Sequence, residues 1–236
     1  MPASPVYAWT MAAGILIGAL FWHRRAKGNP DLLIIYIGAL CGAFMGAKLA
    51  YLIAEGWLDI GKPNLWLRWA TGKSVLGGLL GGYAGVEWTK HLVGHKQSTG
   101  DAFALIMPVG LFLGRLGCLS HGCCQGRLGS TGFRWPAPQV EAGFQVVMLI
   151  AILVLYRRGL LRDRLFFLYL LCYGLFRFAH EFMRDTPKLW LGLSGYQGIA
   201  LVLAALGFIM LRRRSHFMLA DVALTHPPSA SPRASA

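Results

Sequence analysis

Long apolar stretches recur along this chain, and they constrain its fold more than any other feature. Crossing a hydrocarbon layer of about 30 Å takes roughly 20 helical residues, and several of the stretches reach or approach that length. Only 14% of the residues are charged, whereas 56% are hydrophobic. A soluble domain needs more charge than this to cover its surface. The sequence therefore predicts an all-α integral membrane protein rather than a large soluble protein with buried helices.

Seven apolar segments alternate with polar connections, so we expect about seven transmembrane helices in a single domain over residues 1–211. The expected spans are 6–22, 32–54, 74–86, 102–116, 140–156, 165–182 and 196–211. The third and fourth are short and rich in glycine, which lowers helix propensity. Residues 212–236 are basic and end in HPPSASPRASA. That composition cannot build a core, and we expect a disordered cytoplasmic tail.

Basic residues lie on one side of the expected spans and indicate their orientation. Clusters begin near Arg24, Lys90, Arg157 and Arg212, and all fall on the same side when seven spans alternate. Because Lys and Arg accumulate in cytoplasmic loops, the N-terminus should lie outside and the C-terminus in the cytoplasm. These clusters contribute to the formal net charge of +13. No nucleic-acid-binding motif accompanies them, so we expect no nucleic-acid partner.

Besides Glu141 at the start of the fifth, the expected spans contain four charged side chains: Lys48, Arg115, Arg177 and Glu181. Each costs about 2.5–3.5 kcal/mol near the membrane centre unless it is paired or faces a cavity. All four lie toward the outer leaflet, and Glu141 opens the fifth span at the same level. Arg177 and Glu181 are four residues apart, so they share a helix face and can form an ion pair that clips helices together. The convergence of several cations instead favours a pocket for a phosphate head group.

Glycines gather in two segments, GLLGGYAG (78–85) and GRLGC (114–118), and the second contains Arg115. Small residues allow membrane helices to pack closely. Glycine also lets a backbone approach a ligand. Both interpretations fit the sequence.

A set of motifs runs in order along nearly the whole chain. They are KSVLGGLLGG (73–82), TGDAFALIMPVG (99–110), GRLGCLSHGCCQGR (114–127), RWPAPQVEA (134–142), GLFRFAHEFMRD (174–185) and LSGYQ (193–197). Together they resemble the motifs of the prolipoprotein diacylglyceryl transferases. The third is similar to the signature segment of that family, and the fifth matches its late Arg/Glu helix closely.

The resemblance implies a multi-pass transferase of lipoprotein biosynthesis in the bacterial inner (plasma) membrane. Such an enzyme moves the diacylglyceryl group of phosphatidylglycerol onto the lipobox cysteine thiol of a prolipoprotein signal peptide, and glycerol phosphate leaves. The expected partners are phosphatidylglycerol, prolipoprotein signal peptides and the lipid bilayer, with no cofactor and no metal. The chemistry needs cations at the phosphate and a base for the thiol, since the thiolate is the nucleophile.

Candidate site residues follow from the resemblance and from the charges inside the spans. The expected substrate-binding residues are Arg115, Lys48, Gly126 and Glu141. The expected catalytic residues are Arg177, Glu181, His121 and Tyr7. In this assignment the arginines hold the phosphate of the lipid, and Glu181 orients an arginine.

Three positions depart from the family pattern. Leu76 stands where the family has a histidine that is a proposed base. Cys118 and Cys123 stand where the signature has Asn and Glu. These changes bear on the mechanism and not on the fold. They leave two alternatives: a diverged member that binds anionic phospholipid but uses its Cys/His loop for other transfer or redox chemistry, and a non-catalytic lipid-binding membrane protein.

Cys118, His121, Cys123 and Cys124 occupy the altered part of the signature, and several roles fit them. They can form a tight loop of small residues. His121 or His180 can supply the missing base, because imidazole titrates near neutral pH. CxxHxCC also offers soft metal ligands, although it matches no common zinc spacing. A Cys118–Cys123 disulfide is a further alternative, less strained than one between adjacent cysteines.

Overall fold

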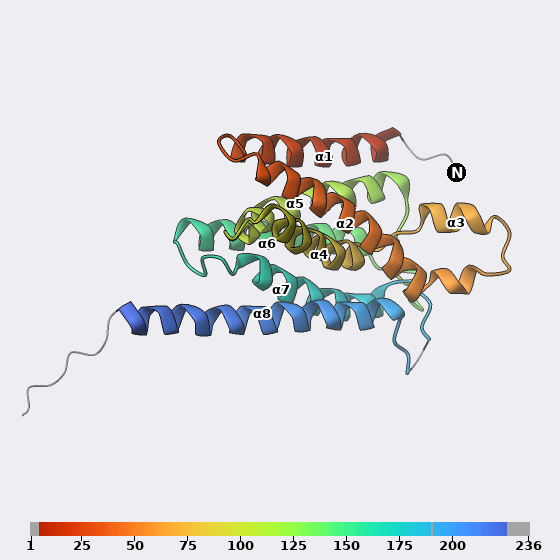
Figure 1. Cartoon of the computed structure of the whole chain (residues 1–236). Helices are drawn as coiled ribbons and strands as arrows, with labels where there is room; N and C mark the ends of the chain where they lie inside the picture. Colours follow the sequence, from red (N-terminus) through yellow and green to blue (C-terminus); the bar gives the residue numbers. More distant parts are fainter. Residues whose placement is uncertain (1–4, 190, 226–236) are drawn as a thin grey trace, which may run out of the picture.

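The computed structural model describes residues 5–189 and 191–225, and helices dominate it (Figure 1). They are α1 (Pro5–Arg25), α2 (Asp31–Ala54), α3 (Leu65–Thr71), α4 (Val75–Val93), α5 (Gly100–His121), α6 (Ala137–Arg157), α7 (Leu165–His180) and α8 (Gly195–Thr225). Short 3-10 helices, η1 (Gly56–Asp59) and η2 (Glu181–Met183), follow α2 and α7. The described residues form two isolated β-bridges and no strand, which confirms the all-α prediction.

Among the described residues, six helices are long and apolar enough to cross a membrane. They are α1, α2, α5, α6, α7 extended through η2, and α8 as far as Arg214. The chain is therefore a multi-pass membrane protein. The third expected span is also a helix, α4, with 19 residues, but its second half carries Glu87 and Lys90 and it is not one of the six.

Several helices extend past the ends expected from sequence. α5 runs to His121, so Cys118 lies in its last turn and not in the following loop. Gly122 ends this helix with a φ of 69°, and its N–H donates to two carbonyls of the last turn. α8 continues to Thr225, so residues 212–225 of the expected tail are helical, because no Gly or Pro interrupts the chain before Pro227. Residues 226–236 lie outside the described residues.

The helices lie side by side, and the segments that connect them lie at two opposite ends of the bundle (Figure 1). One end holds α3, the loop between α5 and α6, and the N-terminal end of α1. The α1–α2 turn, the α6–α7 turn and the C-terminal end of α8 are found at the other. α7 is the most buried of the six candidate spans and packs against α8, α5 and α6. Large apolar side chains such as Trp9, Ile53 and Val147 face outward, as a lipid-exposed surface requires.

Glycines bring α2 and α4 into close contact. They occur every fourth residue on both helices, as Gly38, Gly42 and Gly46 on α2 and Gly77, Gly81 and Gly85 on α4. A Cβ atom built on Gly81 would lie 2.2 Å from the carbonyl oxygen of Gly42, and one on Gly46 would lie 2.3 Å from that of Gly77. For these residues the structure favours helix packing over contact with a ligand, in the manner of repeated small residues in membrane helices.

Replacing Gly81 by alanine is therefore expected to destabilise the protein by about 1–3 kcal/mol, the usual cost of overpacking. The neighbouring atoms are backbone and cannot rotate away. Thermal unfolding of the purified protein in detergent measures the effect. Gly143→Ala in α6 is the matched control, because a Cβ there meets no atom within 4 Å. Equal unfolding temperatures for the two variants would contradict the packing argument.

Candidate active site

A buried group of charges surrounds Glu141 of α6. The Arg115 guanidinium donates a 2.6 Å hydrogen bond to Oε1, and the Tyr173 hydroxyl donates one of 2.7 Å to the same oxygen. Nη1 of Arg177 and Nη1 of Arg184 lie 3.7 Å and 3.9 Å from Oε2. The Glu141 side chain has no exposed surface. A carboxylate this deeply buried is stable only with such partners.

Glu181, at the start of η2, is the second buried carboxylate of the group. Its Oε2 lies 2.8 Å from Nη2 of Arg177, which confirms the ion pair expected from their spacing along α7. Nε of Arg184 lies 3.5 Å from the same oxygen. The Thr186 hydroxyl donates to Oε1 at 2.7 Å, and the Lys188 ammonium donates to the backbone carbonyl of Glu181 at 2.6 Å.

This arginine–glutamate cluster consists of Arg115, Glu141, Arg177, Glu181 and Arg184. Three guanidinium groups against two carboxylates leave one positive charge in excess. In addition, the buried Nε of Arg177 has no hydrogen-bond partner within the described part of the chain. Arginine forks match the oxygens of a phosphate. The cluster therefore has both the charge and the donors to bind a phosphate group.

Two members of this site, Tyr173 and Arg184, were not predicted. Tyr173 precedes Arg177 by four residues, so the helical spacing that paired Arg177 with Glu181 also points to it. One turn further from the cluster, the Tyr169 hydroxyl donates to Oε1 of Gln145 at 2.9 Å, and both side chains are fully buried. These polar contacts hold α6 and α7 in register at the level of the cluster.

Three thiols adjoin the cluster. The Sγ atoms of Cys118, Cys123 and Cys124 all lie within 4.8 Å of one another, and Nη1 of Arg115 lies 3.9 Å from Sγ of Cys118. All three cysteines are free, so the expected alternative of a Cys118–Cys123 disulfide is not observed. The hydrogen bond with Cys118 and the charges of Arg115 and Arg184 lower the pKa of the Cys124 thiol to about 5. Burial and the adjacent Cys124 raise the pKa of Cys123.

Tyr7 and His121 lie together at the end of α5 that carries the thiols. Their ring centroids are 5.8 Å apart. The contact depends on Gly117, because a Cβ there would lie 3.0 Å from Cδ2 of Tyr7 and 2.5 Å from Oγ1 of Thr10. The absence of a side chain at Gly117 therefore lets α1 pack against α5 beside His121.

His180, the other histidine considered as a base, has its acceptor nitrogen occupied. Its Nε2 accepts a 3.2 Å hydrogen bond from the indole N–H of Trp135. Its ring stacks on Phe176, with centroids 5.0 Å apart. A neutral imidazole has one acceptor nitrogen, so this contact disfavours His180 as a base. Leu76, at the position of the family histidine, is 1% exposed and belongs to the hydrophobic core.

Lys48 does not join the arginine–glutamate cluster. Its ammonium donates to the backbone carbonyls of Trp69 and Gly72 at 2.9 Å each, and also to that of Ala70. These carbonyls end α3, where a cation is favourable. The contacts indicate that Lys48 holds α3 against α2, and they do not support the substrate-binding role expected from sequence.

Gly126 lies at a close crossing of two backbone segments. Its N–H donates to the carbonyl of Trp135 at 3.1 Å, and it forms an antiparallel bridge with Arg184. A Cβ at this position would lie 2.3 Å from the Trp135 carbonyl oxygen. Gly126 thus holds the α5–α6 loop against the segment that carries Arg184.

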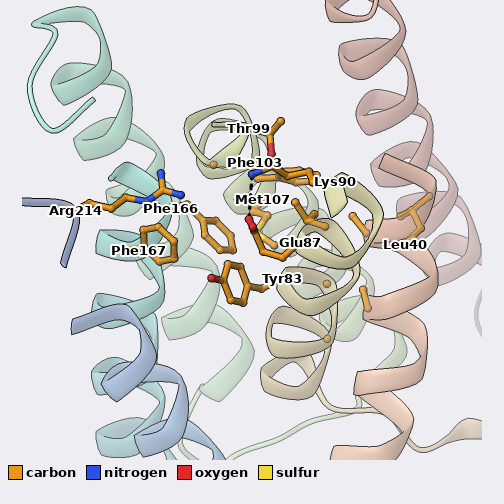
Figure 2. A pocket seen from close by; sticks show the side chains of 16 residues that line it. Leu40, Tyr83, Glu87, Lys90, Thr99, Phe103, Met107, Phe166, Phe167 and Arg214 are labelled. Carbon is orange, nitrogen blue, oxygen red and sulfur yellow. Dashed lines mark hydrogen bonds and ion pairs between the residues drawn. The ribbon is translucent and has the colours of Figure 1, made fainter. Parts of the chain in front are cut away.

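A cavity of about 150 Å³ lies elsewhere, between α2, α4, α5, α7 and α8 (Figure 2). Its lining is mostly apolar, with an ion pair of 3.3 Å between Lys90 and Glu87 and with Arg214 stacked 4.9 Å above the Phe167 ring. None of the expected site residues lines it. The cavity is therefore separate from the arginine–glutamate cluster.

Fold and site together define a multi-pass membrane protein with a buried, net cationic site at one end of its helices. A family model for prolipoprotein diacylglyceryl transferase matches residues 4–213. The chain belongs to this family, which confirms the resemblance of its motifs and makes it a transferase of lipoprotein biosynthesis.

Individual relatives agree with the family model. The chain is 30% identical over 189 residues to the phosphatidylglycerol–prolipoprotein diacylglyceryl transferase of Aeromonas salmonicida, a match that covers 73% of this chain and 66% of the relative. It is 30% identical over 229 residues to that of Chromohalobacter salexigens, covering 84% of each chain. It is 27% identical over 234 residues to that of Bradyrhizobium diazoefficiens, covering 87% of this chain and 82% of the relative.

Proposed function

We propose that this chain transfers the diacylglyceryl group of phosphatidylglycerol to the lipobox cysteine thiol of prolipoproteins at the bacterial inner membrane. The proposal is carried by one observation: Arg115, Arg177 and Arg184 lie around two buried carboxylates. Together these groups have one positive charge in excess. These guanidiniums come from α5, α7 and the segment after η2. An anionic phospholipid supplies the phosphate that such a cluster binds.

The reaction breaks the bond between the glycerol carbon of the diacylglyceryl group and a phosphate oxygen. The acceptor thiolate attacks that carbon, a thioether forms, and glycerol phosphate leaves with the bonding electron pair. Negative charge grows on the phosphate as the bond breaks. Arginines already positioned by buried carboxylates stabilise this charge without reorganisation, so they lower the barrier as well as binding the lipid.

The remaining candidate residues take supporting roles in this proposal. Glu141 and Glu181 orient the guanidiniums through their ion pairs. Tyr173 orients Glu141 by hydrogen bonding to Oε1. His121 lies beside Tyr7 and three residues after Cys118, and it is the candidate base for the acceptor thiol.

We also propose that α4 crosses the membrane as a seventh span, with the N-terminus outside. At about 1.5 Å per residue its 19 residues reach about 28 Å. Figure 1 supports an odd number of crossings, since the N-terminal end of α1 and the C-terminal end of α8 lie at opposite ends of the bundle. The basic clusters near Arg24, Arg157 and Arg212 then face the cytoplasm, and the arginine–glutamate cluster faces the outer leaflet.

Transfer is tested with the purified full-length chain in vesicles. Phosphatidylglycerol vesicles are mixed with a peptide that carries a lipobox cysteine, and the peptide is analysed by mass spectrometry. The expected result is the mass increment of one diacylglyceryl group together with release of glycerol phosphate. Phosphatidylcholine vesicles are the control and should give no increment. An inserted, folded protein that binds phosphatidylglycerol without any increment would reject the proposal in favour of a non-catalytic lipid-binding protein.

A further inference from the structure

The three thiols beside the arginine–glutamate cluster have the geometry of a metal site. Cys118 comes from the last turn of α5, and Cys123 and Cys124 come from the loop that follows. All three Sγ atoms lie within 4.8 Å of one another. Three thiolates around one zinc ion, with Zn–S bonds of about 2.3 Å, place their sulfurs about 4 Å apart. Small side-chain movements would therefore close the site.

The backbone already presents the thiols to a common point. The N–H of Cys123 donates to the carbonyl of Cys118 at 3.2 Å, which folds the loop back on the helix end. Cys124 has a φ of 61°, a left-handed conformation that is uncommon for residues other than glycine. Such conformations cost energy and are concentrated at functional sites. The loop thus holds an unfavourable conformation in which the third thiol joins the other two.

The surrounding charge complements a thiolate–metal centre. A divalent ion with three thiolates carries one negative charge, and the adjacent arginine–glutamate cluster has one positive charge in excess. Nη1 of Arg115 lies 3.9 Å from Sγ of Cys118 and can donate to it. Hydrogen bonds of this kind to a ligand atom orient metal ligands and tune the metal.

We propose that Cys118, Cys123 and Cys124 bind one Zn²⁺ ion and that its fourth position accepts the lipobox cysteine thiol. Among the described residues the group of neighbouring metal-ligating side chains contains these three cysteines and no fourth member. Three protein ligands with one open position are typical of catalytic zinc sites. The proposal rests on the proposed transferase function and adds how the acceptor thiol is activated.

Zinc coordination would form the thiolate of the acceptor in place of a base, either His121 or the missing family histidine. A thiol that binds zinc loses its proton, which passes to solvent, and stays bound as a thiolate. Its sulfur then attacks the glycerol carbon of the lipid held by Arg115, Arg177 and Arg184. The carbon–oxygen bond to phosphate breaks, glycerol phosphate leaves, and the neutral thioether dissociates from zinc. Leu76 can then be apolar without loss of thiolate formation.

The first test is the zinc content of the purified full-length protein, measured by elemental mass spectrometry. We expect about one zinc ion per chain, and a loss of at least about tenfold in Cys123→Ser and Cys124→Ser, whose side chains are only half-buried. Cys41→Ser, an exposed thiol on α2, is the matched control and should keep its zinc. Absence of zinc in the wild type after loading, or equal zinc in all variants, would overturn the proposal. Gel filtration establishes that each variant is folded.

The second test asks whether the acceptor binds the metal. Cobalt is substituted for zinc, and the sulfur-to-cobalt absorption is recorded while a lipobox peptide is added. The absorption should change with the cysteine peptide and not with a peptide in which serine replaces that cysteine. An unchanged spectrum would overturn the role of the fourth position. Both tests omit phosphatidylglycerol, so their failure is distinguishable from failure of the transfer assay.

Discussion

Replacing Arg177 by lysine is expected to reduce diacylglyceryl transfer by about 10²–10³-fold while the protein still inserts and folds. That range corresponds to the loss of one preorganised donor from a transition state. Arg177 bridges two carboxylates, with Nη2 2.8 Å from Glu181 and Nη1 3.7 Å from Glu141. A lysine ammonium keeps the charge but is a single point. It cannot span both carboxylates and also present a fork to phosphate.

Lysine is a better test than alanine at this position. Alanine would leave the buried Glu181 carboxylate with a weakened set of partners, and uncompensated buried charge costs about 3–5 kcal/mol. Loss of transfer could then reflect unfolding. The measurement is the initial rate of peptide modification in phosphatidylglycerol vesicles. Arg157→Lys, an exposed residue at the end of α6, is the control. Wild-type turnover in Arg177→Lys would remove Arg177 from the reaction.

Replacing Glu141 by glutamine is expected to lower the free energy of unfolding by about 3–5 kcal/mol, the cost of leaving buried charge unpaired. Glu141 has no exposed surface and lies within 4.0 Å of three guanidiniums. Glutamine is nearly isosteric but neutral, so the cluster would hold three positive charges against the single carboxylate of Glu181. Its amide N–H groups would also face guanidinium N–H groups.

Thermal unfolding in detergent measures this loss, which corresponds to a decrease of about 6–20 °C for a chain of this size. Glu87→Gln is the matched control. Glu87 pairs with Lys90 at 3.3 Å, but its side chain is 44% exposed. Partly exposed pairs contribute at most about 1 kcal/mol. If both variants unfold at the same temperature as the wild type, Glu141 is not the centre of the cluster.

Helical spacing was sufficient for the part of the site that lies on α7. Arg177 and Glu181 were paired from sequence because residues four apart face the same way, and Tyr173 follows the same spacing. The expectation that Glu141 lies level with Arg115 and Arg177 was also correct, since the lengths of the apolar segments set the position of each residue along its helix. Motif order along the chain was sufficient to indicate the family.

Contacts between distant segments were not predictable in the same way. Lys48 and Arg115 look alike in sequence, since each is a cation within an apolar segment. In the fold, Arg115 pairs with Glu141, 26 residues later, whereas Lys48 donates hydrogen bonds to the carbonyls at the end of α3. Arg184 and Trp135 reach the site only because the α5–α6 loop crosses the segment after η2 at Gly126.

Local composition was sufficient to predict the membrane helices and their number to within one. It also predicted that the buried charges include several cations. The reason is physical: hydrocarbon thickness sets helix length, and the cost of charge in lipid selects the residues that must have a partner. The identity of each partner, the crossing of α2 and α4 at their glycines and the gathering of three thiols required the folded chain. Those features depend on which surfaces meet in space, and the composition of one segment does not specify which other segment packs against it.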